Sequence, residues 1–430
     1  MNYVRRPNKG SAVVTQYRYF LHQALSYARE KKLKNMTENR RMKYRIIAIL
    51  PFFLIMNFGI SCRKQQKEIQ AAHIVEISDD DLKNTASRAS EIFDSVEFVF
   101  LETNDDCLMG RVSKVLVTKD HFILKSAKAV FIFDREGTFV RRIYHVGRGH
   151  GEYIGLDYIT FLSDGTLLLL DSEHKKMLGY STSDSLLFDV KLPFFPGAAE
   201  ELNEDELLFV TSGKDDHLIV WNQQKEAIKH RFMPFDIRYS CTIDRPLLVD
   251  NGTVCFTQDY RPGLFKVDKD GIRWQWYIDA GERTIQEGDM QPVNFFGATV
   301  YAPKPGKSSV SDFLLSEDIL FFRCQWNIED PLPYDFFYSR KSGSKLIYKN
   351  NSFVDDLSFY SYYHDLISVT PSGEFVCVYD AADWLSQIDG FSSKVKELGL
   401  EDAYNALLPK LSGLKPDDNP VLALFRIKDF

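Results

Sequence analysis

The residues best suited to bind or act on a ligand lie in one short glycine-rich segment, residues 147–153. It contains Arg148, His150, Glu152 and Tyr153. Arginine and glutamate would bind charged or hydroxyl groups, histidine could exchange a proton near neutral pH, and tyrosine could stack on a ring. A structural interpretation competes, because the glycines permit a tight turn in which Glu152 and Tyr153 bond to a neighbouring element.

Three further side chains are candidates for ligand contact. His174 follows two carboxylates, Asp171 and Glu173, and could face the glycine-rich segment. Trp326 and Trp384 lie in or beside long insertions, where exposed aromatic faces would suit sugar-ring stacking. The alternatives are a solvated surface histidine and tryptophans that pack the insertions onto the core.

The sequence contains no nucleophile elbow, Walker loop, HExxH or EF-hand motif, so we predict no cofactor. Five cysteines follow Cys62 with no CxxC pair and no spaced histidine pair, which predicts free thiols and no metal site. Carboxylate pairs for glycoside hydrolysis remain possible, because they need only be close in space. Catalysis is therefore an open question, with a non-enzyme favoured.

A membrane anchor is indicated near the start of the chain. Lys43 and Arg45 precede an apolar run over residues 46–58, and Gly59-Ile60-Ser61 leads into Cys62. This order is typical of a lipoprotein signal peptide over residues 42–61, cleaved before a lipidated Cys62. The run is shorter than the roughly 20 apolar residues that span a bilayer. Residues 1–41 then precede the true start as a mis-annotated upstream extension.

Charge excludes one class of partner. Residues 1–61 hold twelve Lys and Arg against two Asp and Glu, so the chain from Cys62 onward carries a net charge of −17 rather than −7. Such an acidic protein has no excess of basic residues with which to attract nucleic acid. The residues directly after Cys62 are nevertheless basic, at positions 63, 64 and 67.

These residues are positioned by a repeated double hairpin. Six turns flanked by apolar β-type runs recur 40 to 66 residues apart, and most are followed by a second hairpin. A four-stranded propeller blade has this form. The turns are those around Asp120, Gly165, Asp205, Gly252, Asp318 and Gly373.

We therefore predict an all-β fold, a six-bladed β-propeller over residues 92–430, preceded by a tether over residues 62–91. The C-terminal strand over residues 422–427 would pair with residues 96–101 to complete the last blade. Apolar residues at three- and four-residue steps predict a small helical insertion in that blade, over about residues 381–418.

Long connections predict which face binds. Residues 280–311, 325–335 and 380–418 all join strands on the same face of a propeller, whereas the turns on the other face are short. Long loops in a compact domain are more often functional than accidental. The face with the long loops is therefore the candidate binding face.

The run GRGHGEYIGLDYITFLSDGTLLLLD, residues 147–171, resembles the six-bladed β-propeller lipoproteins of Bacteroides-type bacteria, whose blades are NHL-like. The resemblance covers residues 92–430 and implies the fold; in that family proline is common where His150 stands. The absence of a catalytic motif, together with the anchor, favours a membrane-tethered binding or scaffolding module for a glycan, a peptide or an envelope protein. The alternative is an extracellular polysaccharide lyase or hydrolase acting at the mouth of the central channel. Surface lipoproteins of Bacteroides-type bacteria tend to carry acidic residues directly after the cysteine, so the resemblance implies the periplasmic face of the outer membrane for a chain with basic residues there.

Overall fold

The computed structural model describes residues 70–211, 216–239, 245–268, 271–295, 298–330, 332–350, 352–360 and 366–430. The expected upstream extension, signal peptide and lipidated Cys62 lie outside the described residues. Within these ranges, no helix is long and apolar enough to cross a membrane.

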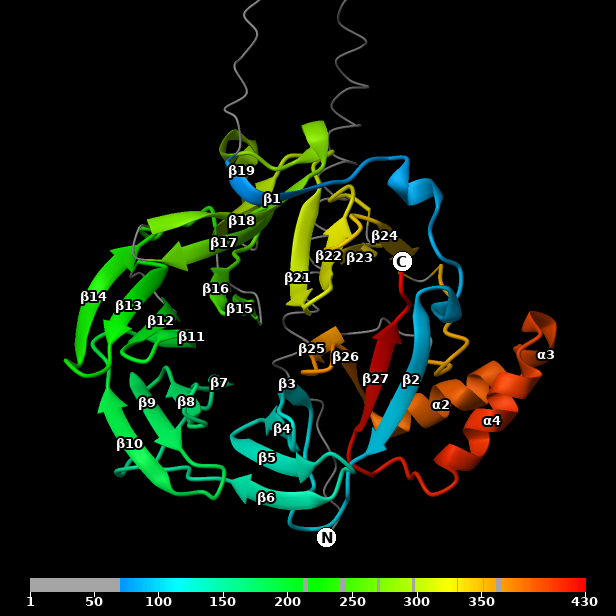
Figure 1. Ribbon diagram of the computed structural model, residues 1–430, viewed down its shortest axis with the longest axis horizontal. Helices are drawn as coiled ribbons and strands as arrows, with labels where there is room; N and C mark the ends of the chain where they lie inside the picture. Colours follow the sequence, from blue (N-terminus) through cyan, green and yellow to red (C-terminus); the bar gives the residue numbers. More distant parts are fainter. Residues whose placement is uncertain are drawn as a thin grey trace, which may run out of the picture.

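Six sheets surround a common centre, as predicted for a six-bladed β-propeller (Figure 1). Each blade is an antiparallel meander, and the Asp-Gly and Asn-Gly turns take the positive φ that tight hairpins need, with Gly165 at 84° and Gly252 at 75°. The first three blades are β3 (Val112–Val117), β4 (His121–Ser126), β5 (Ala129–Asp134) and β6 (Phe139–Ile143); β7 (Tyr158–Phe161), β8 (Leu167–Asp171), β9 (Lys176–Tyr180) and β10 (Leu186–Lys191); and β11 (Pro196–Asn203), β12 (Glu206–Thr211), β13 (Leu218–Asn222) and β14 (Ala227–Phe232).

The other three blades repeat the meander with additions. Blade 4 gains a fifth strand, and blade 6 is built from both ends of the fold. They contain β15 (Leu247–Asp250), β16 (Thr253–Phe256), β17 (Gly263–Asp268) and β18 (Gly271–Asp279); β21 (Ser309–Leu315), β22 (Ile319–Gln325), β23 (Tyr334–Ser339) and β24 (Lys345–Lys349); and β25 (Leu366–Val369), β26 (Phe375–Tyr379), β27 (Val421–Ile427) and β2 (Phe93–Phe100).

Ring closure through the last strand is confirmed. β27 lies between β26 and β2, and it pairs antiparallel with β2 from Phe93↔Ile427 to Phe100↔Val421. The first five residues of β27 are buried. The core itself lies between neighbouring sheets, and so central strands such as β8 are buried on both faces.

The segment expected to be a tether differs from the prediction in its described part. β1 (Ala71–Glu76) pairs in parallel with β18 at the outer edge of blade 4. The chain then passes through two short 3₁₀ helices, η1 (Asp81–Lys83) and η2 (Ala89–Glu91), and forms bridges Ala86↔Tyr348 and Arg88↔Val354. The reason is hydrophobic, since Val75 and Ile77 are buried against blade 4. Residues 71–91 therefore belong to the folded domain.

Insertions lie at the periphery of the ring. The predicted helical insertion forms α2 (Ala381–Ser392), α3 (Val395–Leu398) and α4 (Glu401–Leu411), which lie outside the ring beside β2 (Figure 1). Between blades 4 and 5, a hairpin of β19 (Met290–Phe295) and β20 (Ala298–Pro303) follows η3 (Gly281–Arg283) and η4 (Glu287–Asp289).

Candidate functional site at the ring axis

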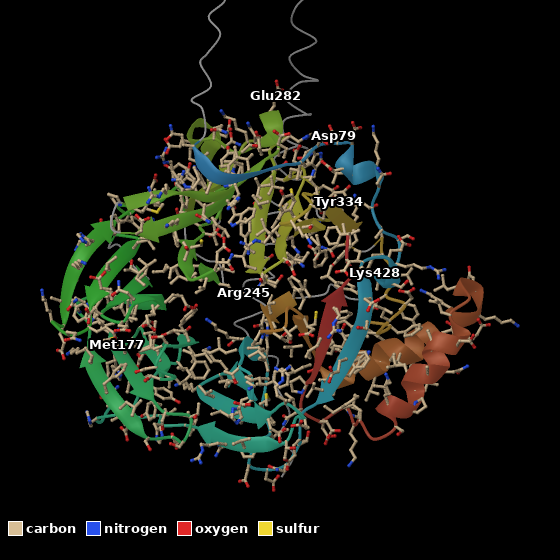
Figure 2. The ribbon with its side chains drawn as sticks, viewed as in Figure 1. Asp79, Met177, Arg245, Glu282, Tyr334 and Lys428 are labelled. Atoms are coloured by element: carbon tan, nitrogen blue, oxygen red, sulfur yellow. The ribbon has the colours of Figure 1, made fainter. Side chains whose placement is uncertain are left out.

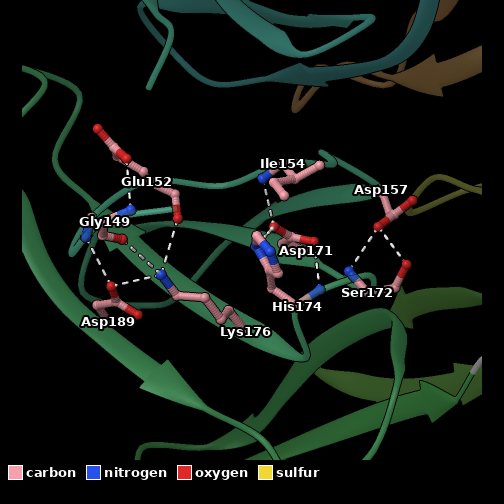
Figure 3. A network of polar contacts seen from close by, with 10 residues as sticks. Gly149, Glu152, Ile154, Asp157, Asp171, Ser172, His174, Lys176 and Asp189 are labelled. Carbon is pink, nitrogen blue, oxygen red and sulfur yellow. Dashed lines mark hydrogen bonds and ion pairs between the residues drawn. The ribbon is translucent and has the colours of Figure 1, made fainter. Parts of the chain in front are cut away.

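The glycine-rich loop is fastened to the outer strands of blade 2 (Figure 3). Asp189 of β10 accepts hydrogen bonds from Gly151 N at 2.8 Å and Lys176 Nζ at 2.8 Å, and it lies 3.3 Å from His150 Nδ1. Lys176 also donates to the carbonyls of Gly149 and Glu152. The loop therefore has a structural task, which is to hold the connection from blade 1 against β9 and β10.

Two of the predicted loop residues, Glu152 and Tyr153, help to hold the loop in place. Glu152 Oε2 accepts a 2.6 Å hydrogen bond from Gly149 N within the loop. Tyr153 is 0% exposed and donates its hydroxyl to Lys128 O at 2.8 Å, and burial raises the pKa of its phenol. Tyr153 has no exposed face, so the prediction that it stacks on a ligand is wrong. Arg148 and His150 are the exposed members of the loop.

His174 also belongs to a structural network (Figure 3). Its Nδ1 lies 3.1 Å from Asp171 Oδ2, and its backbone N–H donates to Asp171 Oδ1 at 3.0 Å. Asp171 is 0% exposed and accepts a further bond from Ile154 N at 2.7 Å. The carboxylate thereby joins the loop to the turn between β8 and β9. In the described part of the chain, no group of three His, Cys, Asp or Glu side chains could hold a metal ion.

The two tryptophans lie apart from this loop. Trp384 of α2 is 0% exposed, donates Nε1–H to Ser358 O at 2.8 Å and packs on Phe98 and Phe100 of β2. It fixes the helices to blade 6, so the prediction that it contacts a ligand is wrong. Trp326 is half-buried and bonds to Asp79 at 2.8 Å. The predicted candidates therefore do not converge on one site.

A different set of side chains converges at the centre of the ring. Most of these side chains belong to the innermost strands of blades 1, 2 and 3, and one lies two residues before β15 of blade 4. We call this set the axial cluster, and its members are Lys114, Tyr158, Thr160, Glu200 and Arg245.

Contacts between blades define the axial cluster. Lys114 Nζ lies 3.3 Å from the centroid of the Tyr158 ring. The Tyr158 hydroxyl donates to Glu200 Oε1 at 3.0 Å, and Thr160 Oγ1 lies 3.0 Å from both Glu200 oxygens. Arg245, near the middle of the ring in Figure 2, donates Nη1–H to Ile367 O of β25 in blade 6 at 3.4 Å. Side chains or backbone of five blades therefore meet here.

The cluster lies toward the face with the long inter-blade loops. Each inner strand starts at that face, and Tyr158 is the first residue of β7, while Lys114 is the third residue of β3. Arg245 stands two residues before β15 begins. Lys114, Glu200 and Arg245 are half-buried, so water still reaches parts of them, whereas Tyr158 is 4% exposed.

Burial and neighbouring charges perturb the ionisable groups of the cluster. Burial is the main cause that lowers the pKa of Lys114 to about 7; Glu200 opposes it, and the cations of Arg245 and Lys125 reinforce it. Burial also raises the pKa of Glu200, against the effects of Lys114 and of the hydroxyl donors. Perturbed pKa values of this kind are concentrated at functional sites.

One cationic group in the cluster lacks a hydrogen-bond acceptor. Among the described residues, Arg245 Nε is buried with no partner, whereas Lys114 Nζ contacts the face of the Tyr158 ring. An unpaired buried donor costs about 1–3 kcal/mol, so an acceptor supplied by a ligand would be stabilising. Lys125, on β4 behind Lys114, adds a third positive charge and donates to Ser113 Oγ at 3.0 Å.

Sequence reasoning missed this cluster because its members are far apart in the chain and none belongs to a motif. One signal was available. Lys114 in VSKVLV and Glu200 in PGAAEELN are charged residues, and each lies in the first strand of its blade. Charges on the innermost strand of a propeller must face its axis or a neighbouring blade.

Comparison with known families places the chain in one of them. The family model described as "Domain of unknown function (DUF4934)" matches residues 73–426, and the chain belongs to this family. The match begins at β1, which agrees with the assignment of that strand to the folded domain. No curated protein matches the chain.

The fold is shared with a solved structure, and two further structures have lower similarity. A Bacteroides fragilis protein described as exported superposes with a TM-score of 0.65 at 19% identity, covering 83% of this chain and all of that one. A DUF4221 family member from Bacteroides vulgatus has a TM-score of 0.45 at 8% identity, covering 78% of this chain and 99% of that one. Virginiamycin B lyase from Staphylococcus aureus has a TM-score of 0.37 at 12% identity, covering 65% and 81%. At 19% identity the similarity to the exported protein concerns the fold alone.

Proposed function

We propose that this protein is a binding or scaffolding propeller of the cell envelope whose ligand docks at the axial cluster, from the face with the long loops. The observation that carries the proposal is the convergence of Lys114, Tyr158, Glu200 and Arg245 from four blades. One of these side chains, Arg245, retains a buried donor without an acceptor. Propellers bind ligands where loops and inner strands of several blades meet, because every blade then contributes to one site.

The proposed ligand is a glycan, a peptide or an envelope protein, and it is tested with a glycan and peptide library on the chain from residue 63 onward. Substituting Lys114 and Arg245 together by methionine should abolish retention of the ligands that the unaltered protein binds. Lys119→Met is the matched control, because Lys119 is exposed in the β3–β4 turn on the opposite face. Retention that survives the double substitution would contradict the proposal.

The alternative, a polysaccharide lyase or hydrolase, is supported by one specific feature. An amine with a pKa of about 7 would be a base at neutral pH, and Lys114 lies directly on a tyrosine ring. The same library is therefore assayed for turnover. Cleavage products that disappear with Lys114→Met would favour the enzyme over the binding module.

We also propose that the protein is attached to the outer membrane, on its periplasmic face, through a lipidated Cys62. The supporting pattern is the basic start, short apolar run and small residues before this cysteine. Cys62→Ala should abolish labelling by radioactive palmitate and release the protein from membranes. Persistent labelling of this variant would exclude the lipoprotein assignment, and protease treatment of intact cells would distinguish the two faces.

A further inference from the structure

The axial cluster offers a recognition pattern that narrows the class of ligand. We propose that it binds the carboxylate group of a small ligand or chain end, and that Lys114 takes up a proton as the carboxylate binds. This inference rests on the proposed docking of the ligand at the axial cluster. It goes further by naming the chemical group that is recognised.

The geometry of Arg245 favours a planar carboxylate. Its Nη1 is occupied by the Ile367 carbonyl, which leaves the edge formed by Nε and Nη2. The same edge binds a carboxylate elsewhere in this chain, where Arg323 Nε lies 2.7 Å from Asp335 Oδ1 and Nη2 lies 2.9 Å from Oδ2. Two parallel N–H···O bonds of this kind match carboxylate geometry.

The local charge favours an anion. Arg245, Lys125 and the carboxylate Glu200 all act electrostatically on Lys114, so cations outnumber carboxylates around it, in a chain that is acidic as a whole. Glu200 already accepts hydrogen bonds from Tyr158 and Thr160. A carboxylate matches this charge and the planar edge of Arg245, and comparison with inorganic phosphate tests the preference for a single charge.

Proton uptake follows from the environment of Lys114. The charged groups facing it are Glu200 from β11, Arg245 before β15 and Lys125 from β4, with the Tyr158 ring of β7 beneath it. A bound carboxylate would add a negative charge and raise the pKa of Lys114 above its value of about 7. Affinity should therefore be highest below pH 7 and fall by up to about tenfold per pH unit above it, until the raised pKa is reached.

Calorimetric titration of the chain from residue 63 onward tests this with matched probes: galacturonate, galactose, L-alanine and inorganic phosphate. We expect galacturonate to bind at least tenfold more tightly than galactose. At pH 7.5, runs in two buffers of different ionisation enthalpy should reveal net proton uptake on binding, because a pKa of about 7 leaves most of Lys114 unprotonated in the free protein. Binding of L-alanine equal to that of galacturonate would identify an amino acid or peptide end as the source of the carboxylate.

Variants separate recognition from folding. Lys114→Met and Arg245→Met should each weaken galacturonate binding at least tenfold, with Lys119→Met as the unaltered control and melting curves as the check on folding. Lys114→Arg keeps a permanent charge, so it should retain binding within a few-fold while abolishing proton uptake and the pH dependence.

Three results would overturn the inference. They are equal binding of galactose and galacturonate, tighter binding of phosphate than of galacturonate, and galacturonate binding that is absent or insensitive to both methionine substitutions. A neutral library ligand lost on substitution of Lys114 and Arg245 would refute the carboxylate and leave the proposed function standing. If no ligand of any class depends on these two residues, both proposals fail.

Discussion

Glu152 shows at the level of single residues why the glycine-rich loop has its composition. Its carboxylate folds back across the loop to Gly149 N, at 2.6 Å. A Cβ atom placed on Gly147 would overlap this carboxylate, and one on Gly149 would come within 3.0 Å of it. The glycines thus leave room for a side chain of their own loop, which is the structural interpretation of this motif.

Replacing Gly147 by alanine should therefore displace the Glu152 side chain from Gly149 N. Since the backbone φ of Gly147 is not positive, the added methyl group brings no conformational strain beyond this overlap. We expect a loss of about 1 kcal/mol in the free energy of unfolding, measured by urea titration. In a Glu152→Ser background the same substitution should cost almost nothing. Equal costs in the two backgrounds would contradict this assignment.

At the residue scale, sequence reasoning predicted where polar side chains gather but not which of them face solvent. Tyr153 and Trp384 are the same residue types that bind sugars elsewhere, and burial decided their role here. The four described cysteines, Cys107, Cys255, Cys324 and Cys377, were predicted as thiols outside any disulfide; they are buried and form no disulfide among the described residues. Cys241 lies outside the described residues. The axial cluster could not be predicted from the sequence, because its contacts depend on the curvature of the whole ring.

At the scale of elements, the hairpins and the pairing of β27 with β2 were predicted correctly, whereas the pairing of β1 with β18 was not. Each of the six predicted turns joins the first two strands of a blade, because a short polar turn between two apolar β-type runs specifies a hairpin locally, most strongly at Gly165 and Gly252. No comparable turn signal in the sequence indicates that β1 pairs with β18. Ala71 faces Trp274 across a parallel pair, about two hundred residues apart in sequence, and the strand itself is only six residues long.

The contribution of β1 can be measured directly. The sequence predicted a tether over residues 62–91. The structure instead predicts that deleting residues 63–70 leaves stability unchanged, while deleting residues 63–77 costs about 3–5 kcal/mol, because Val75 and Ile77 lose their buried contacts.

A matched pair of substitutions provides the control for these deletions. Val75 is 1% exposed and its neighbour Ile74 is 46% exposed on the other face of β1. Val75→Ala should therefore lower the free energy of unfolding by about 2 kcal/mol, and Ile74→Ala by less than about 0.5 kcal/mol. Similar values for the two variants would show that β1 does not pack on blade 4 in solution.

At the scale of the whole molecule, the position of β1 determines which part of the ring would lie near a membrane anchor. It is the outermost strand of blade 4, so the chain enters the domain at the rim rather than at either face (Figure 1). If Cys62 carries the lipid, the eight residues from 63 to 70 reach at most roughly 29 Å. The rim of blade 4 would then lie near the membrane, and both ends of the ring axis would stay open to ligands.

The integrity of the ring depends on β27, which supplies the link between the last blade and the first part of the fold. Its residues Val421 to Phe425 are buried, and the Phe425 ring lies 4.7 Å from that of Phe93 on β2. Deleting residues 420–430 would leave β26 and β2 as unpaired edges and uncover part of the core between blades 5 and 6. Exposed edges of this kind promote aggregation and reduce cooperative stability.

We therefore expect the chain that ends at residue 419 to be insoluble or to melt far below the full-length protein. Deleting only residues 428–430 removes two hydrogen bonds, Lys428 N to Ile92 O and Ser342 Oγ to Phe430 O, and should leave a folded monomer. Adding a peptide of residues 419–430 during refolding should restore solubility to the truncated chain, because β27 pairs with both of its neighbours through the backbone. Size-exclusion chromatography and thermal melting provide the readouts. A truncated chain that remains monomeric, with the melting curve of the full-length protein, would show that the ring does not close through this strand.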